Sequence, residues 1–421
     1  MAAASLGNTD IVTQSPEGSI EESMHTRTKF STLARMAAGL MVAATLSFPA
    51  LAQPPGPPGE KFKVVTVVEG LKNPWSMAWL PNGDMLVTER GGSLRIVRGG
   101  KLLPAAVPGV PAVRAAGQGG LQEVAVHPKF AENHYIYLSY SKPRSDGKEG
   151  TTALLRAKFE NDRLVDPKEI FEAKAWNDRP GHFGARIAFD RDGYLFMSVG
   201  DRMAGLGGPT GFDATDHPAQ SLMSHQGKIL RLRDDGTVPP DNPFVGRKDA
   251  LPEIWSWGHR NPQGLAVHPV TNQLWETEHG PQGGDELNLI KKGANYGWPT
   301  IGYGANYVTG TELHQGRARE GMEQPKAFWV PSIGISGLMF YTGDKFPNWK
   351  GNVFMGGMSA QWRQLVRVTL GGETVANREP LLFGQYRFRD VREGPDGYIY
   401  IATDSQGPNQ TSAIIRLEPN T

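Results

Sequence analysis

The chain has 421 residues, no Cys, and 44 basic against 43 acidic residues, so its formal net charge is +1. The lack of Cys excludes a disulfide scaffold, a thiolate metal site and a Cys nucleophile, and the lack of a basic surplus argues against a nucleic-acid-binding protein. Hydrophobic residues make up 39% of the chain, enough for a large core. The 52 Gly and 32 Pro follow no collagen period and predict turns between many short strands.

The first 52 residues have the features of a secretory signal. Basic residues follow Met24, and after them come an apolar run over residues 36–46 and an Ala-x-Ala site ending at Ala52. This order predicts export to the periplasm or the medium, with cleavage near Ala52. The alternative is a membrane anchor, but the run is short for a span and stable insertion is not expected. Translation can start at the first Met or at Met24, and residues 53–60 form a Pro-rich leader.

From about residue 61 a short motif recurs six times. In each copy a turn containing Pro, Asp, Asn or Gly precedes a short strand rich in aromatic and branched residues, and an apolar patch often stands before the turn. The six copies lie at residues 81–87, 132–138, 191–197, 271–275, 350–354 and 395–401. A turn between two apolar strands is the signal of a β-hairpin.

The spacing of this repeat favours a radial architecture. Units some 45 to 80 residues apart are typical of four-stranded blades with loops of unequal length. Residues 61–419 are therefore expected to form an all-β domain, a six-bladed β-propeller, and an irregular pair of sandwiches is the alternative. Because the loops on one face of a propeller carry its function, the polar loops between the strands are the candidate site.

One polar loop carries a candidate base. His182 stands just before a predicted strand, and an imidazole there can accept a proton near neutral pH. Asp201 ends the next strand and could orient that imidazole. The alternatives are a structural His and a turn cap. Gln118, in an earlier Gly-rich loop, offers a donor and an acceptor beside a close backbone approach, although a plain glycine turn is equally consistent.

Other loops carry candidate groups for anions and cations. Arg260 has the planar fork that suits a carboxylate, and Arg387 and Arg389 stand at period two, which in a strand places both on one face. Such guanidiniums suit a polyanionic partner, and structural Arg or cross-strand pairs are the alternatives. The loop over residues 278–286 is rich in oxygen ligands and Gly, as Ca²⁺ loops are, but lacks EF-hand spacing and could be a solvated acidic loop.

Taken in order, these loops resemble the soluble quinoprotein glucose dehydrogenase family, most closely its periplasmic aldose sugar dehydrogenase branch. The resemblance runs from about residue 63 to residue 417. It rests on six segments: Gly117–Leu121 with His127-Pro128-x-Phe130, the His182 loop, His259–Gly264, Glu278–Glu286, Asn295–Pro299 and Arg387–Val391.

The resemblance implies a six-bladed propeller that binds pyrroloquinoline quinone (PQQ), a tricyclic ortho-quinone with three carboxylates. Its expected cofactor-binding residues are Arg260, Arg387 and Arg389 for the carboxylates, and Gln118 and Asn261 for the quinone. An aldose would be oxidised at C1 to the lactone, with His182 as general base, Asp201 orienting it, and the hydride passing to PQQ. The electrons would pass to an external acceptor.

The resemblance also implies Ca²⁺ in two roles. One ion would polarise the quinone from the backbone oxygens of Gly280 and Pro281. A second, structural ion would take Glu286 and the carbonyl of Tyr296.

The chain departs from the glucose dehydrogenase branch at three places. His279 stands where that branch has Gln, and Gly181 stands where it has Asp. An expected cofactor-contacting Lys has no match, and Gln361 or Arg363 is offered instead. A Ca²⁺-dependent lactone hydrolase and a non-catalytic propeller that binds sugars or proteins are therefore the alternative functions. A monomer or weak dimer is expected.

Overall fold

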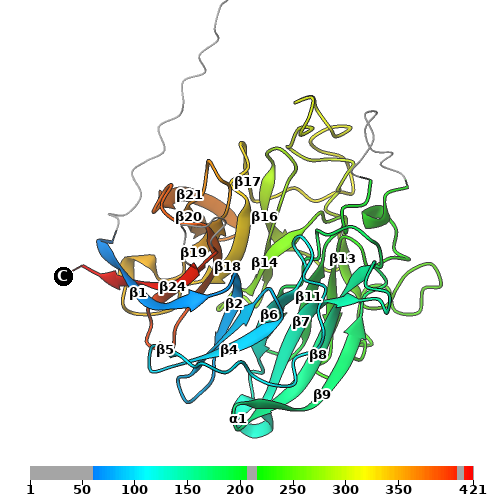
Figure 1. Ribbon diagram of the computed structural model, residues 1–421. Coiled ribbons are helices and arrows are strands. Elements are labelled where there is room, and N and C mark those ends of the chain that lie inside the picture. The colour runs from blue at the N-terminus through cyan, green and yellow to red at the C-terminus, as the bar shows by residue number, and fades with distance from the viewer. Residues whose placement is uncertain (1–59, 206–215, 405–411, 421) are drawn as a thin grey trace, which may run out of the picture. The chain divides into compact units, whose positions relative to one another are not determined.

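The structure is a computed structural model that describes residues 60–205, 216–404 and 412–420. The predicted signal peptide and almost all of the Pro-rich leader lie outside these ranges. The described chain is built from 24 strands in six four-stranded antiparallel sheets (Figure 1). Its helices are α1 (Phe130–Asn133) and two 3₁₀ turns, η1 (Pro218–Gln220) and η2 (Pro347–Trp349). None of the described helices has the length and apolar character needed to span a membrane.

Each sheet is one blade, and in blades 1 to 5 neighbouring strands follow one another in the chain. Blade 1 contains β2 (Pro74–Trp79), β3 (Met85–Glu89), β4 (Ser93–Arg98) and β5 (Lys101–Leu102). Blade 2 contains β6 (Leu121–Val126), β7 (Tyr135–Pro143), β8 (Gly150–Glu160) and β9 (Arg163–Glu172). Blade 3 contains β10 (Ile187–Phe189), β11 (Leu195–Val199), β12 (Lys228–Leu232) and β13 (Ile254–Trp257).

The second half of the chain repeats the pattern. Blade 4 contains β14 (Pro262–Val267), β15 (Leu274–Glu278), β16 (Asp285–Ile290) and β17 (Ala327–Trp329). Blade 5 contains β18 (Ile335–Phe340), β19 (Val353–Gly357), β20 (Leu365–Gly371) and β21 (Thr374–Leu381). Blade 6 contains β22 (Phe388–Glu393), β23 (Ile399–Thr403), β24 (Ser412–Pro419) and, as its fourth strand, β1 (Phe62–Leu71).

The first strands of the blades form a closed ring. Strands β2, β6, β10, β14, β18 and β22 each contact the next, and β22 contacts β2. Each of the six sequence motifs joins the first and second strands of one blade, so the predicted hairpins and the six-bladed propeller are confirmed. At residues 132–138 the motif begins within the short helix α1 rather than in a simple turn.

The ring is fastened by its N-terminal strand. In Figure 1, β1 (blue) lies beside β24 (red), and the two strands pair antiparallel from Phe62 with Pro419 to Leu71 with Ser412. Blade 6 therefore joins the two ends of the described chain. Its closure satisfies backbone groups that would otherwise form open sheet edges.

Apolar residues fill the spaces between neighbouring blades. Leu86 of blade 1 and Leu138 of blade 2, for example, are fully buried in one cluster. Fully burying a side chain of this size contributes about 1.5–3 kcal/mol. Because the first two strands of a blade run antiparallel, the start of the first and the end of the second lie at one edge. This geometry gathers the polar loops at one end of the ring.

Candidate active site

His182 is held in an unusual backbone conformation in the loop before β10. Its φ is +51°, its side chain is buried, and its backbone N–H donates to Oε1 of Gln118 at 2.9 Å. Gly200 passes directly beneath this loop, where a Cβ would lie 2.3 Å from the His182 carbonyl oxygen. A residue held in left-handed backbone by its surroundings is a common feature of functional sites.

Asp201 fixes the orientation of the His182 ring. Nδ1 of His182 lies 2.7 Å from Oδ1 of Asp201, and Nε1–H of Trp298 donates to Oδ2 at 2.7 Å. The backbone N–H of Met203 also donates to Oδ1 at 2.8 Å. The carboxylate therefore accepts a hydrogen bond from Nδ1–H, which leaves Nε2 as the basic nitrogen.

The surroundings keep His182 neutral. Burial, and then the positive charge of Arg260, lower the pKa of His182 below its ordinary value, although Asp201 acts in the opposite direction. Burial alone would raise the pKa of Asp201, but His182 and then Arg260 outweigh it and keep that pKa low. A neutral imidazole paired with a carboxylate can accept a proton near pH 7.

Two guanidiniums line a neighbouring cavity of about 270 Å³. Arg387 and Arg389 both pair with the carboxylate of Asp404, the latter at 3.4 Å. Among the described residues, Asp404 is the one acidic group that forms an ion pair with either of them. Burial lowers the pKa of Arg387, and it lowers the pKa of Arg389 to about 9, so Arg389 stays charged at neutral pH. The cavity therefore suits an anionic ligand.

Polar atoms without a partner face this cavity. Gln118 and His279 also line it. Nε of Arg389 and Nε2 of His279 are buried and have no hydrogen-bond partner within the part of the chain that the structure describes. Burial, and then Arg260, lower the pKa of His279 to about 3, so its imidazole is neutral. Buried polar atoms nearly always have a hydrogen-bond partner. These two nitrogen atoms are therefore candidate contacts for a ligand in the cavity.

Arg260 lies on the other side of His279. Its Nη1 donates to the carbonyl oxygens of His279 at 3.1 Å and Gly280 at 2.8 Å, and its guanidinium lies over the ring of Trp298. Asn261 is fully buried. Its Oδ1 accepts from the backbone N–H of Gly184 at 3.2 Å, and its Nδ2 has no partner in the described ranges. The guanidinium of Arg260 thus binds backbone carbonyl groups, whereas those of Arg387 and Arg389 pair with the Asp404 carboxylate.

The predicted metal ligands share one small cavity. It measures about 20 Å³, room for a water molecule or one ion. Gly280, Pro281, Glu286 and Tyr296 all line it, as do Arg260 and His279. The backbone carbonyl of Gly280 already accepts a hydrogen bond from Arg260, but an oxygen with two lone pairs can also face an ion. The small cavity brings the predicted metal ligands together, next to the cavity that Arg387 and Arg389 line.

The sequence did not predict a role for several residues near the site. Trp298 belongs to the segment Asn295–Pro299, for which the sequence predicts no role of its own, yet its indole N–H donates to Asp201. His279 was noted only as a departure, yet it lines both cavities. Glu276 was not singled out, although alternation with Glu278 along a strand was a signal for two carboxylates on one face. Burial, and then Glu278, raise the pKa of Glu276 well above its ordinary value.

A family model described as glucose/sorbosone dehydrogenase matches residues 71–416. The chain belongs to this family. Its members are oxidoreductases, so the chain is an enzyme of the same class. It is 42% identical over 362 residues to aldose sugar dehydrogenase YliI of Escherichia coli, covering 85% of this chain and 92% of that protein.

Solved structures of the family agree with this assignment. The apo-form of the soluble aldose sugar dehydrogenase from Escherichia coli matches with a TM-score of 0.77 and 39% identity, covering 86% of this chain and 100% of that one. The PQQ-bound form of aldose sugar dehydrogenase from Streptomyces coelicolor matches with a TM-score of 0.68 and 28% identity, covering 86% and 100%. The six-bladed propeller of this chain is thus similar in fold to these relatives.

Proposed function

We propose that the protein is a PQQ- and Ca²⁺-dependent aldose dehydrogenase that oxidises the sugar at C1 to the lactone. The observation that carries this proposal is the position of Gln118. Its side chain holds the backbone of His182 and also lines the cavity of Arg387 and Arg389. A base and an anion-binding cavity therefore adjoin each other through one residue. A relative from Streptomyces coelicolor has been solved in a PQQ-bound form.

The residues of the cavity fit a cofactor with several carboxylates. Arg387 and Arg389 would bind carboxylates, and the unpartnered Nε of Arg389 supplies a donor. Arg260 would complete the cationic surroundings from the far side of His279, and Gln118 and Asn261 would donate to quinone oxygens. When bound, PQQ supplies the two-electron acceptor that none of the side chains provides.

His182 would remove the proton of the C1 hydroxyl group. Its pKa is lowered, so Nε2 is free to accept that proton at neutral pH. Asp201 holds Nδ1–H and stabilises the positive ring that forms after proton transfer. Trp298 in turn holds Asp201, so the base cannot rotate away from the sugar.

Of the two proposed metal ions, one would occupy the neighbouring small cavity of about 20 Å³ and the other would lie beside it. The carbonyls of Gly280 and Pro281 would face an ion next to the quinone, where its charge would add to that of Arg260. Glu286 and the carbonyl of Tyr296 would hold a structural ion. We also propose that the mature chain is exported after cleavage near Ala52, acts as a monomer or weak dimer, and passes electrons to an external acceptor.

Reconstitution tests the function directly. Purified protein is mixed with PQQ and Ca²⁺, and reduction of an electron-accepting dye is followed on addition of glucose and other aldoses. Sugar-dependent dye reduction that requires PQQ supports the proposal. Lactone cleavage without PQQ would instead identify a hydrolase, and PQQ-independent sugar binding without turnover would identify a non-catalytic propeller. Either of these results contradicts the proposal.

A further inference from the structure

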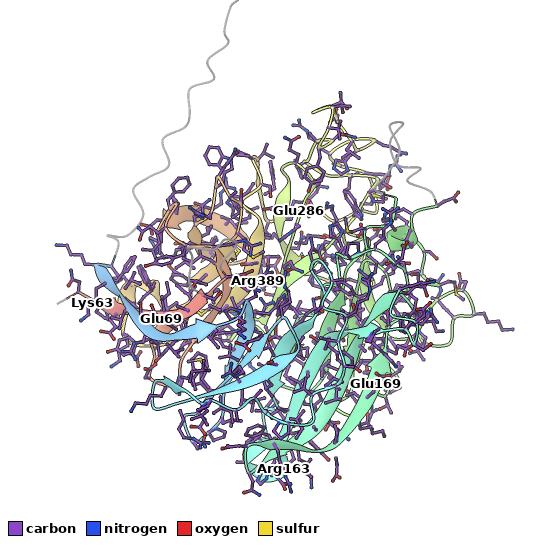
Figure 2. The ribbon with its side chains drawn as sticks, in the orientation of Figure 1. Lys63, Glu69, Arg163, Glu169, Glu286 and Arg389 are labelled. Carbon is purple, nitrogen blue, oxygen red and sulfur yellow. The ribbon has the colours of Figure 1, made fainter. Side chains whose placement is uncertain are left out.

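A cavity of about 540 Å³ lies between the outer strands of blades 4 and 5, and none of the proposed catalytic residues lines it. Strand β17 lines one side, and Val375 and Arg378 of β21 line the other. Nη1 of Arg378 donates to the carbonyl oxygen of Phe328 at 2.7 Å, which joins the two blades. Glu286, labelled in Figure 2, pairs in register with Phe328 and locates this part of blade 4. We call this cavity, whose lining includes Trp329, Trp362, Gln364 and Arg378, the outer groove.

Two indole rings give the outer groove much of its apolar surface. Trp329 ends β17 and packs partly against the apolar core between blades 4 and 5. Trp362 stands in the loop between β19 and β20 and is 41% exposed, and the neighbouring lining residues Phe328 and Val330 are exposed as well. Neither indole N–H has a hydrogen-bond partner among the described residues. A group of exposed apolar side chains around a cavity marks a binding site rather than a part of the core.

Gln364 supplies the outer groove with a polar group that folding leaves without a partner. The residue is only 9% exposed, yet its side-chain amide makes no hydrogen bond with any other residue in the described ranges. Such an amide offers both a donor and an acceptor, and a nearly buried one is normally paired. The open volume beside Gln364 is therefore suited to a ligand that can both donate and accept hydrogen bonds.

The charge of the outer groove is low. Of the two cations that line it, Lys326 lies 3.6 Å from Glu373, whereas Arg378 is exposed and forms no ion pair with a described acidic residue. One unpaired guanidinium supplies several N–H donors but does not make a site for a polyanion. The groove therefore favours a neutral polar ligand.

A saccharide combines the properties that these side chains require. A pyranose ring has C–H groups on its faces and hydroxyl groups at its rim. The electron-rich faces of indole rings attract C–H groups, and hydroxyl groups pair with an amide or a guanidinium. A purely apolar ligand would leave Gln364 and Arg378 without hydrogen bonds, which costs binding free energy. The volume of the cavity lies in the range of small-molecule sites rather than of flat protein interfaces.

We propose that the outer groove binds a neutral saccharide, with its rings stacked on Trp329 and Trp362 and its hydroxyl groups bound by Gln364 and Arg378. The inference goes beyond the proposed oxidation, because this site needs neither PQQ nor a free hydroxyl group at C1. It gives the chain a second sugar-binding site, separate from the one that His182 serves.

The outer groove shares two segments of the chain with the candidate active site. The carbonyl oxygen of Trp329 accepts the N–H of Gly284 at 2.7 Å, and Gly284 lines the small cavity. Met358, in the same loop as Gln364, lines the cavity of the two guanidiniums. A saccharide in the groove therefore rests on segments that also form walls of the active site.

The test uses protein without PQQ, labelled with ¹⁵N at the indole nitrogens and titrated with methyl α-maltoside. This glycoside has two pyranose rings and no free C1 hydroxyl group, so it reports binding and not oxidation. The NMR signals of Trp329 and Trp362, assigned with Trp329→Phe and Trp362→Phe, should shift saturably. The signal of Trp176, whose indole donates to Glu172 outside the groove, should stay in place, and glycerol should shift none of the three. Groove signals that do not move would overturn the inference.

Two variants test the polar contacts. Gln364→Met keeps the length of the side chain but removes its donor and acceptor, and it should weaken binding about tenfold. Arg378→Ala changes an exposed residue, so it guards against a variant that fails to fold, and it should weaken binding about threefold to tenfold. The exposed Gln315→Met is the matched control and should bind as wild type does. Unchanged affinity in both Gln364→Met and Arg378→Ala would refute the site.

Two other outcomes separate this inference from its neighbours. Groove signals that broaden with protein concentration and ignore the glycoside would assign the groove to contact with a second copy of the chain, which contradicts the proposal. Because the titration contains no PQQ and no oxidisable sugar, glycoside binding can succeed while dye reduction fails, and the reverse. The outer groove and the proposed function therefore fail separately.

Discussion

Two buried charge clusters in this propeller differ in how they are neutralised. In the central channel, Arg186 lies 2.7 Å from Glu123 and 2.9 Å from Asp390. Arg392 lies 2.5 Å from Glu123 and 3.0 Å from Asp390. Two cations thus face two anions, and each acid contacts both bases. We refer to these four residues as the channel cluster.

The groups at the candidate site are not balanced in this way. Arg387 and Arg389 share one carboxylate, and the neutral amide of Asn288 is shared by three glutamates of blade 4, Glu276, Glu278 and Glu286. The first group has more cations than anions, and the second has three acidic side chains that no Lys or Arg among the described residues pairs with. Both groups contain buried polar atoms that have no hydrogen-bond partner among the residues described.

The comparison distinguishes charged side chains that pair with one another within the fold from charged side chains that are available to bind ligands. The acids and bases of the channel cluster form ion pairs with one another, and Arg186 also donates to the backbone oxygens of Gln263 at 2.6 Å and Arg389 at 3.2 Å. It therefore supports the floor of the cavity. Groups that remain uncompensated after folding need an external partner, which is the property of a binding site.

The largest effect is expected from the catalytic base. His182→Ala should lower turnover about 10²–10⁴-fold, the contribution of a general base, because no other group takes the C1 proton. Steady-state dye reduction with saturating PQQ measures this loss, while PQQ should remain bound. The exposed His134→Ala is the control and should keep full activity. Turnover near that of wild type in His182→Ala would refute the assigned base.

The channel cluster should instead control stability. Arg186→Met leaves Glu123 and Asp390 with one buried counter-charge and should lower the free energy of unfolding by about 3–5 kcal/mol. Urea unfolding followed by fluorescence gives this value. Adding Glu123→Gln should recover part of the loss, because the two residues are coupled. A loss below about 1 kcal/mol, typical of a surface ion pair, would remove the contrast between the two clusters.

Removing a cavity guanidinium should weaken cofactor binding more than folding. Arg389→Ala should weaken the binding free energy of PQQ by about 1.5–3 kcal/mol, the value of a charge-assisted hydrogen bond, and so raise the dissociation constant. Fluorescence titration of the apo-protein measures it. The exposed Arg378→Ala should bind PQQ as wild type does. An unchanged titration for Arg389→Ala would place the cofactor elsewhere.

The smallest effect concerns protonation of the base. The lowered pKa of His182 favours its neutral form, so the imidazole should stay neutral as pH falls through 6.5 and become charged only below that value. NMR titration of ¹⁵N-labelled protein without cofactor reports this, with His182→Gln assigning the signal. Arg260→Gln removes a positive neighbour and should raise the pKa. A midpoint above 6.5 in wild type would contradict the electrostatics of the site.

Two pairs of site residues could be predicted because the residues of each pair are close together in the sequence. His182 and Asp201 each stand at the edge of a strand of one hairpin, so their proximity followed from the hairpin itself. Arg387 and Arg389 were separated by one residue and were expected together, and both contact Asp404. Trp298 lies in a different blade from Asp201, so their hydrogen bond could not be read from spacing.

By itself the sequence determined the six inner hairpins, because each depends on a turn and on apolar residues only a few positions apart. It also determined that the loops would be polar. Only the tertiary structure decided that β1 closes blade 6 and that three glutamates meet at one amide. It also decided that Arg260 stands apart from Arg387 and Arg389 across His279. Those outcomes depend on strand register and on contacts between distant segments, which local patterns do not encode.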